Sequence, residues 1–230
     1  MAETDRSDLA NHMAELARSM ASPRPVEEVL AGVTKAIVEL MTAADTAGVL
    51  LVGTGGKYES HSGTSDLIYE LDQLQEKHGT GPCLDAATKE LVVRTDDFEH
   101  EQRWPEYSQA VCQLGVRSSL SFKLYTGDRT AGALNVFSRR PHAFSSESEA
   151  VGSVLAAHAA VAIMASKEGE QLQSAVASRD VIGQAKGIIM ERFNVDAVRS
   201  FEMLRQLSQE MNVRLTEVAQ KIIDTRKDDG

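Results

Sequence analysis

The stretch "RDVIGQAKGIIMERF" at 179–193 combines cations and glycines within one helical pattern. Gly183 and Gly187 lie four residues apart, with Lys186 beside the second glycine and Arg179 one turn before the first. Each glycine costs about 0.5 to 1 kcal/mol relative to alanine in a helix interior. On a helical wheel both glycines and both cations fall to one side of the apolar residues. Such a bare backbone between cations could accept a second helix or a phosphate backbone.

Two interpretations of these glycines stay open at the level of the residues. In the first, they let another helix of the same chain pack closely, and the cations are simply solvated. In the second, this face binds the phosphates of a nucleic acid, which relies on lysine and arginine. In both, the apolar stripe is expected to face the core of its own module. That stripe consists of Ile182, Ala185, Ile189 and Phe193.

A second candidate for chemistry is Cys83, which follows Gly81 and Pro82 at the predicted start of a helix. The positive end of a helix dipole favours a thiolate, so a redox role is one interpretation and a buried structural thiol is the other. Cys112 is the only other cysteine, and neither belongs to a metal-binding spacing. The sequence contains no nucleophile triad and no phosphate-binding glycine loop. We therefore expect no enzyme, no cofactor and no metal.

The elements before this stretch predict an α+β domain. Helical spacing of apolar residues opens the chain at 7–20 and resumes after the break "SPRP". Leu120, Phe122 and Leu124 alternate with polar residues, which indicates a strand with one buried face. The first 165 residues therefore predict a mostly antiparallel sheet flanked by helices. Its β-type runs are 46–53, 58–63, 91–95, 118–125 and 131–138, and its later helical stretches are 66–77 and 103–114.

From Ser146 onward the pattern is helical and lacks proline. One long helix is expected to run from the first domain into the last module, with Gly169 as the place for a bend. Its near-heptad spacing is typical of a dimerising coiled coil, and two helices packed within one chain are the alternative. The residues at this spacing are Val151, Val154, Val161, Ala165, Leu172, Ala175, Ile182 and Ile189.

Two shorter helices complete the tail as a three-helix unit. Asp196 is the candidate N-cap of the first, and Thr216 is the candidate cap of the second. The first of these helices is expected to present one apolar side. That side carries Val198, Phe201, Leu204 and Met211.

Charge is distributed unevenly along the chain. Residues 1–173 contain 25 acidic and 15 basic groups, whereas residues 174–230 contain nine of each, so the net charge of −10 belongs to the first part. The tail therefore stays compatible with a nucleic-acid partner. The longest apolar run, 151–165, falls short of the roughly 18 residues that a membrane span needs. We expect a cytoplasmic protein without a membrane partner.

The pattern "R..I..AKGIIM", continued by "S.EML" and by "N..L.EVA..I", resembles the ANTAR domain. This family of three-helix modules binds RNA in bacterial transcription antitermination. The resemblance implies a dimer that binds paired hairpins in a nascent transcript and so prevents a terminator from forming. The RNA-binding residues that it implies are Arg179, Gln184, Ala185, Lys186, Gly187, Arg192 and Arg205.

The segments "GTGPCLDAA", "RWPEYSQA", "LGVRSSLSFKL" and "GALNVFSRRPHAFS" resemble a GAF sensor domain of the kind that precedes ANTAR modules in actinobacteria. The cyclic-nucleotide pattern of that family is absent here, so this ligand is not implied. The resemblance implies a pocket for an unknown small molecule, or a surface for a partner protein. The pocket is expected between the loop at Cys83 and one sheet face, lined by Cys83, Trp104, Leu120, Phe122 and Leu134.

The expected organisation is an N-terminal helix at 1–20, a GAF-like domain at 21–165 and an ANTAR-like domain at 166–230. The expected function is an RNA-binding antitermination regulator in which the first domain senses a signal. A sensor or interaction protein without RNA binding is the alternative, followed by a GAF-type thiol reductase.

Overall fold

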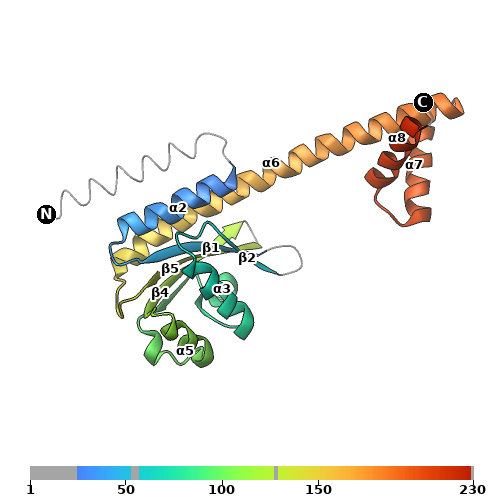
Figure 1. Ribbon diagram of the computed structural model, residues 1–230. Helices are drawn as coiled ribbons and strands as arrows, with labels where there is room; N and C mark the ends of the chain where they lie inside the picture. Colours follow the sequence, from blue (N-terminus) through green and yellow to red (C-terminus); the bar gives the residue numbers. More distant parts are fainter. Residues whose placement is uncertain (1–24, 53–56, 127–128, 229–230) are drawn as a thin grey trace. The chain divides into compact units, whose positions relative to one another are not determined.

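The computed structural model describes residues 25–52, 57–126 and 129–228 (Figure 1). The helix predicted at 1–20 lies outside these residues. The chain divides into two compact units, with the division between Ser166 and Lys167. Each unit is described by itself.

The first unit is built on a five-stranded antiparallel sheet, as predicted. Its strand order is β2-β1-β5-β4-β3, and β1 is paired to both β2 and β5. β4 forms a hairpin with β5, in which Phe122 lies opposite Leu134 and Ser121 opposite Asn135. The strands are β1 (Thr46–Val52), β2 (Tyr58–His61), β3 (Val92–Thr95), β4 (Ser118–Thr126) and β5 (Arg129–Ser138).

Helices cover both faces of this sheet, which corrects the expectation of one buried face (Figure 1). The helices α2 (Val26–Leu40) and α6 (Ser146–Phe193) pack on one face, where Leu120, Phe122 and Leu134 point. The other face is covered by α3 (Leu67–His78), α4 (Pro82–Thr88), the short 3₁₀ helix η1 (Phe98–His100) and α5 (Pro105–Gln113). Ser119 and Ser121, which the alternation placed toward water, are therefore fully buried.

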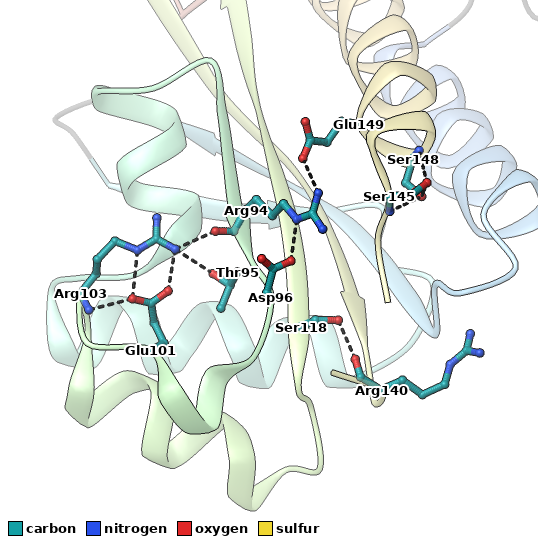
Figure 2. A network of polar contacts seen from close by, with 10 residues as sticks. All are labelled: Arg94, Thr95, Asp96, Glu101, Arg103, Ser118, Arg140, Ser145, Ser148 and Glu149. Atoms are coloured by element: carbon teal, nitrogen blue, oxygen red, sulfur yellow. Dashed lines mark hydrogen bonds and ion pairs between the residues drawn. The ribbon is translucent and has the colours of Figure 1, made fainter. Parts of the chain in front are cut away.

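A polar network fixes the start of α6 to the sheet (Figure 2). Arg94 of β3 donates to Glu149 of α6 at 3.0 Å and to Asp96 at 2.6 Å. The Ser145 hydroxyl accepts a hydrogen bond from the Ser148 backbone at 3.3 Å, which caps the first turn. These contacts join β3 to α6 on the side of the sheet that α2 also covers.

α6 is one helix from Ser146 to Phe193, as predicted, and it includes Gly169. Its segment Ser146–Ser166 is long and apolar enough to cross a membrane by length and composition. Within the first unit, however, this segment buries Leu155, Ala159 and Ile163 in the core beside the sheet. The apolar character therefore matches a helix that covers a sheet.

The second unit packs the end of α6 against α7 (Ala197–Met211) and α8 (Leu215–Asp228). Its core consists of Ala185, Ile189, Leu204, Val218 and Ala219. The predicted N-cap is confirmed, because the Asp196 carboxylate accepts from the backbone of Val198 and Arg199. Thr216 lies inside the first turn of α8 and is not its cap, since the helix begins one residue earlier.

Candidate functional site

A groove of about 960 Å³ opens on the second unit along α6. It gathers three of the predicted RNA-binding residues, Arg179, Gln184 and Lys186, around the bare backbone of Gly183. One acidic residue, Asp180, also lines it. We call this surface the basic groove; its full lining is Ala175, Ser178, Arg179, Asp180, Ile182, Gly183, Gln184, Lys186 and Phe201.

Gly183 and Gly187 of α6 do not serve packing within the chain. A Cβ atom built on Gly183 or on Gly187 meets no atom within 4 Å beyond its own helix turns. The interpretation that they admit another helix of the same tail is therefore wrong, because α7 and α8 stay clear of both positions. The face stays open to a partner that is not part of this chain.

The other predicted RNA-binding residues do not line this groove. Gly187, next to Lys186 in the chain, is outside the lining but has open space beside it. Ala185 is fully buried between Ile189 and α7, so it belongs to the core and cannot contact RNA. Arg192 lines a different groove of about 450 Å³, next to Phe193. Arg205 is exposed on α7, one helical turn after Phe201 and on the same side as it.

Phe201 is a member of the basic groove that sequence reasoning missed. The residue is 40% exposed, and the Lys186 ammonium lies 5.8 Å from the ring centre, within reach of a cation–π contact. The sequence placed it on the apolar side of α7 together with Leu204, but only Leu204 is buried. Val198, Met211 and, on α6, Phe193 are exposed as well, so only part of each predicted apolar stripe is buried.

In the first unit Cys83 lies at the centre of a buried polar cluster. Its thiol accepts a hydrogen bond from Gln75 Nε2 at 2.7 Å, and its backbone N–H donates to Gln75 Oε1 at 2.9 Å. Ser121 Oγ lies 3.9 Å from the sulfur. Burial raises the pKa of the Cys83 thiol well above its ordinary value, so the helix start does not yield a thiolate. Cys112 is partly exposed, and burial raises its pKa too.

The residues predicted to line the sensor pocket do not lie on one side of the sheet. Cys83 and Trp104 belong to the core under α3, α4 and α5, whereas Leu120, Phe122 and Leu134 belong to the core on the opposite face of the sheet. Neighbouring residues of a strand point to opposite faces. The residues of β4 and β5 on the Cys83 side are therefore Ser119, Ser121, Ala133, Asn135 and Phe137.

Trp104 serves as an anchor between two helices. It is almost fully buried, and its indole N–H donates to Asp85 Oδ2 of α4 at 2.9 Å. The Arg103 guanidinium lies 4.4 Å from the ring centre on the outer side. Both the indole N–H and a ring face are thus engaged by the protein.

Several buried polar atoms in this layer have no hydrogen-bond partner. Asp72 on α3 is 5% exposed; Ser60 donates to its Oδ2 at 2.6 Å, and its Oδ1 has no partner. Burial raises the pKa of Asp72 to about 6. Buried polar atoms are usually paired, so each exception calls for an explanation. The other unpartnered atoms among the described residues are Tyr107 OH, Ser108 Oγ, Ser119 Oγ and both amide atoms of Asn135.

The chain therefore has two parts. The first is an α+β unit with buried polar groups in one layer of its core, and the second is a small helical unit that carries a basic groove. Residues 23–164 match the GAF domain family, and residues 170–223 match the ANTAR domain family. The chain belongs to the GAF domain family and carries an ANTAR domain after it. GAF domains are sensor domains, and the ANTAR domain is the RNA-binding module of antitermination. This architecture is regulatory in kind.

Solved structures show the same fold for the first unit. The GAF domain of a phosphoenolpyruvate-protein phosphotransferase from Coxiella burnetii is 17% identical, with a TM-score of 0.56 over 71% of this chain and 96% of that one. The corresponding domain from Acinetobacter is 14% identical, with a TM-score of 0.53 over 69% and 94%. A free methionine-R-sulfoxide reductase from Neisseria meningitidis is 16% identical, with a TM-score of 0.53 over 70% and 91%. No curated protein sequence matches this chain.

Proposed function

We propose that this protein is a cytoplasmic antitermination regulator whose ANTAR domain binds hairpin RNA through the basic groove and whose GAF domain senses a signal. The observation that carries the proposal is the open space at Gly183 and Gly187. Two glycines that destabilise a helix and serve no packing within the chain are explained by a ligand that approaches its backbone. Because the cations Arg179 and Lys186 lie beside these glycines, the expected ligand is negatively charged.

The groove also matches the chemistry of RNA beyond its phosphates. Proteins recognise unpaired RNA bases by stacking them on aromatic rings and by hydrogen bonds to their edges. Phe201 offers an exposed ring, and Gln184 offers an amide in the same groove. We therefore assign phosphate contacts to Arg179 and Lys186, a stacking contact to Phe201 and a flanking contact to Arg205. Arg192 lies beside the other groove and is assigned no RNA contact.

A homodimer is part of this proposal, because paired hairpins need two reading surfaces. Within the GAF unit, α6 leaves Val154 and Val161 exposed by 42% and 58%. These valines are seven residues apart and lie on the side of α6 opposite Leu155, Ala159 and Ile163, which face the core. Within the ANTAR unit, Leu172 and Val176 are exposed too. Such an unpartnered apolar seam is the surface that a second copy of α6 would cover.

A thiol reductase is the weaker alternative. A reactive cysteine is accessible and has a lowered pKa, whereas Cys83 is fully buried and its pKa is raised. An interaction protein without RNA binding would need another explanation for the bare, cationic groove. RNA binding is therefore the proposal that the groove supports best.

The test replaces the glycines of the full-length protein by leucine. Because both positions face open space, Gly183→Leu and Gly187→Leu leave the fold intact, and each gains about 0.8 kcal/mol of helix propensity. We expect both variants to be at least as stable as the wild type and to bind a two-hairpin RNA at least tenfold more weakly. RNA affinity is measured by fluorescence anisotropy and stability by thermal unfolding.

Gly32→Leu is the matched control, since Gly32 also faces open space inside a helix, α2, but lies outside the basic groove and the seam of α6. It should gain the same stability and keep wild-type RNA affinity. Wild-type affinity in Gly183→Leu would refute the groove as the RNA site, and wild-type affinity in Gly187→Leu as well would refute the whole glycine face, since Gly187 lies just outside the groove lining. Absence of RNA binding by the wild-type chain at low salt would refute the proposed function itself.

A further inference from the structure

The basic groove contains one carboxylate, Asp180, which the phosphate contacts assigned above do not use. Asp180 is exposed and lines the groove together with Arg179 and Lys186. The phosphates of RNA are negatively charged, so a carboxylate next to their cationic contacts repels them. A groove that bound phosphates alone would therefore be weakened by this residue.

Asp180 has no partner in the described part of the chain. A helical residue can pair with the residues three and four positions away. For Asp180 these are Val176, Ala177, Gly183 and Gln184, none of which is a cation. Neither a hydrogen bond nor an ion pair joins Asp180 to any of the described residues. It also lies well inside α6, away from the N-terminal turn where the helix dipole stabilises a carboxylate.

Two acids of α7 show the usual alternative. Glu202 pairs with Arg199 at 3.1 Å, one helical turn away. Glu210 accepts a hydrogen bond from Gln206 at 2.8 Å. Asp180 differs from both, because its two oxygens are left to whatever enters the basic groove.

The helix places the cations and the carboxylate on opposite sides of Gly183. Gly183 follows Arg179 by four positions and Asp180 by three, so on the helix surface it lies between them, one turn further along. Lys186 follows Arg179 by seven positions and lies on the same side as it. Gln184 follows Asp180 by four and lies on its side. A ligand that crosses α6 at Gly183 therefore meets cations on one side and hydrogen-bond acceptors on the other.

A nucleotide of RNA matches this arrangement. A carboxylate accepts hydrogen bonds and donates none, and the groups of RNA that donate are the base edges and the ribose 2′-hydroxyl. The base is assigned to the ring of Phe201, which lies on the Lys186 side of the groove. The ribose directly adjoins its phosphate. With a phosphate at Arg179, it is therefore the ribose that reaches the neighbouring residue, Asp180.

We propose that Asp180 accepts a hydrogen bond from the 2′-hydroxyl of one ribose and so makes the basic groove select RNA over DNA. This inference rests on the proposed function and adds a specificity-determining residue to its RNA site. The 2′-hydroxyl is the group by which a protein distinguishes RNA from DNA at a given site. DNA lacks this donor, so Asp180 repels its phosphates without a hydrogen bond in return.

The test uses the full-length protein and a two-hairpin RNA in which each loop nucleotide is replaced in turn by its 2′-deoxy form. A sensitive position is then repeated with 2′-fluoro, which also lacks the donor but keeps the ribose pucker of RNA. Affinity is measured by fluorescence anisotropy. In the wild type we expect a position at which both replacements weaken binding about tenfold, the size of a hydrogen bond to a charged group.

Asp180→Ala should bind the unmodified RNA several-fold more weakly and lose nothing further when the sensitive position is replaced. Such non-additivity is the mark of two groups in contact. Asp180→Asn keeps a carbonyl acceptor and should retain part of the penalty. Asp180 is exposed inside a helix, where alanine is the better helix former, so the alanine variant should keep its fold, which thermal unfolding checks.

Glu217→Ala is the matched control, since Glu217 is an exposed acid of α8 that lies outside the basic groove. It changes net charge equally and should keep the tenfold penalty at the sensitive position. A penalty that persists in full in Asp180→Ala would overturn the inference, and so would a wild type without any sensitive position.

A DNA hairpin pair of the same sequence separates this inference from the proposed function. Equal wild-type affinity for the RNA and the DNA would overturn the role of Asp180 and leave the basic groove as a nucleic-acid site. A preference for RNA that shrinks in Asp180→Ala but not in Glu217→Ala would support the inference. Absence of RNA binding by the wild type would refute the proposed function, and this inference with it.

Discussion

The two units of this chain treat polar and apolar side chains in opposite ways. The GAF unit buries polar atoms that have no partner, among them Asp72 Oδ1, Tyr107 OH and both amide atoms of Asn135. The ANTAR unit buries a small apolar core and leaves Phe193, Phe201 and other large apolar side chains exposed. A buried polar group without a partner destabilises the fold. An exposed aromatic side chain adds no burial energy, and a patch of such side chains marks an interaction site. This difference supports the proposals of a sensor role for the first unit and of an open RNA-binding surface on the second.

The largest expected effect concerns the exposed apolar seam of α6. Val161→Glu places a charge where the proposed dimer buries a valine, and burying an unpaired charge costs several kcal/mol. The dimer dissociation constant, measured by sedimentation, should rise at least a hundredfold. Ser153→Glu is the control, since Ser153 is exposed on α6 about 100° away from Val154 around the helix. A dimer that tolerates Val161→Glu would place the interface elsewhere, and a monomeric wild type with RNA present would refute the dimer.

The second effect compares two aspartates of the GAF unit with opposite environments. Asp97 accepts from Arg117 through both its oxygens, at 2.9 and 3.0 Å, and these bonds lower its pKa below the ordinary range. Asp72 has no cation partner, and burial raises its pKa to about 6. Asp97 therefore stabilises the fold above about pH 4 and loses this contribution as the pH falls. Below about pH 4 the Asp72 carboxyl is protonated in both the folded and the unfolded state, so its burial does not change the free energy of unfolding through ionisation. Above about pH 6 it is ionised, and its burial destabilises the fold.

Asparagine at each position should show this difference in sign. At pH 8, Asp97→Asn should destabilise the protein by about 2 kcal/mol, because a charged hydrogen-bonded pair is lost. Asp72→Asn should stabilise it by about 2 kcal/mol at pH 8, and this gain should vanish near pH 4. Chemical denaturation across this pH range measures both. A loss of stability in Asp72→Asn at pH 8 would mean that the carboxylate already has a compensating partner in the free protein.

The sequence predicted the sheet, the order of its elements and the long helix, because these depend on local periodicity and turn residues. It could not decide which face of β4 belongs to the sensor pocket. The resemblance to GAF domains placed Leu120 and Phe122 in the pocket, yet they pack against α2 and α6. The sequence did contain a relevant pattern: Ser119 and Ser121 alternate with the apolar residues of β4. Helices were also predicted both before the first strand and between the later strands. Polar strand residues beneath a second helical layer become buried.

The basic groove was predicted in part for a related reason. The spacing of Arg179 and Lys186 places them on one helical face whatever the tertiary structure, and both line the groove. Phe201 comes from another helix, so its position beside Lys186 depends on how α7 packs. Helical periodicity grouped Phe201 with Leu204, which is three residues later and lies on the same side of the helix. Phe201 is also four residues before Arg205, so the spacing alone fits an exposed position equally well. Only the packing of Leu204 against Ala185 decides which side is buried.

The smallest expected effect tests the charge of the basic groove against charge elsewhere on the same unit. Lys186→Ala should weaken hairpin RNA binding a fewfold and lower the slope of log affinity against log salt by about 0.7 to 0.9, because one phosphate contact is lost. Lys221→Ala on α8 is the matched control, since Lys221 is exposed and lies outside the groove. It changes net charge equally and should leave the salt slope unchanged. If both variants shift the slope alike, the ANTAR unit attracts RNA through its overall charge, and the groove does not position the phosphates. If Lys186→Ala alone shifts it, the open glycine face and its cations act as one RNA-binding surface.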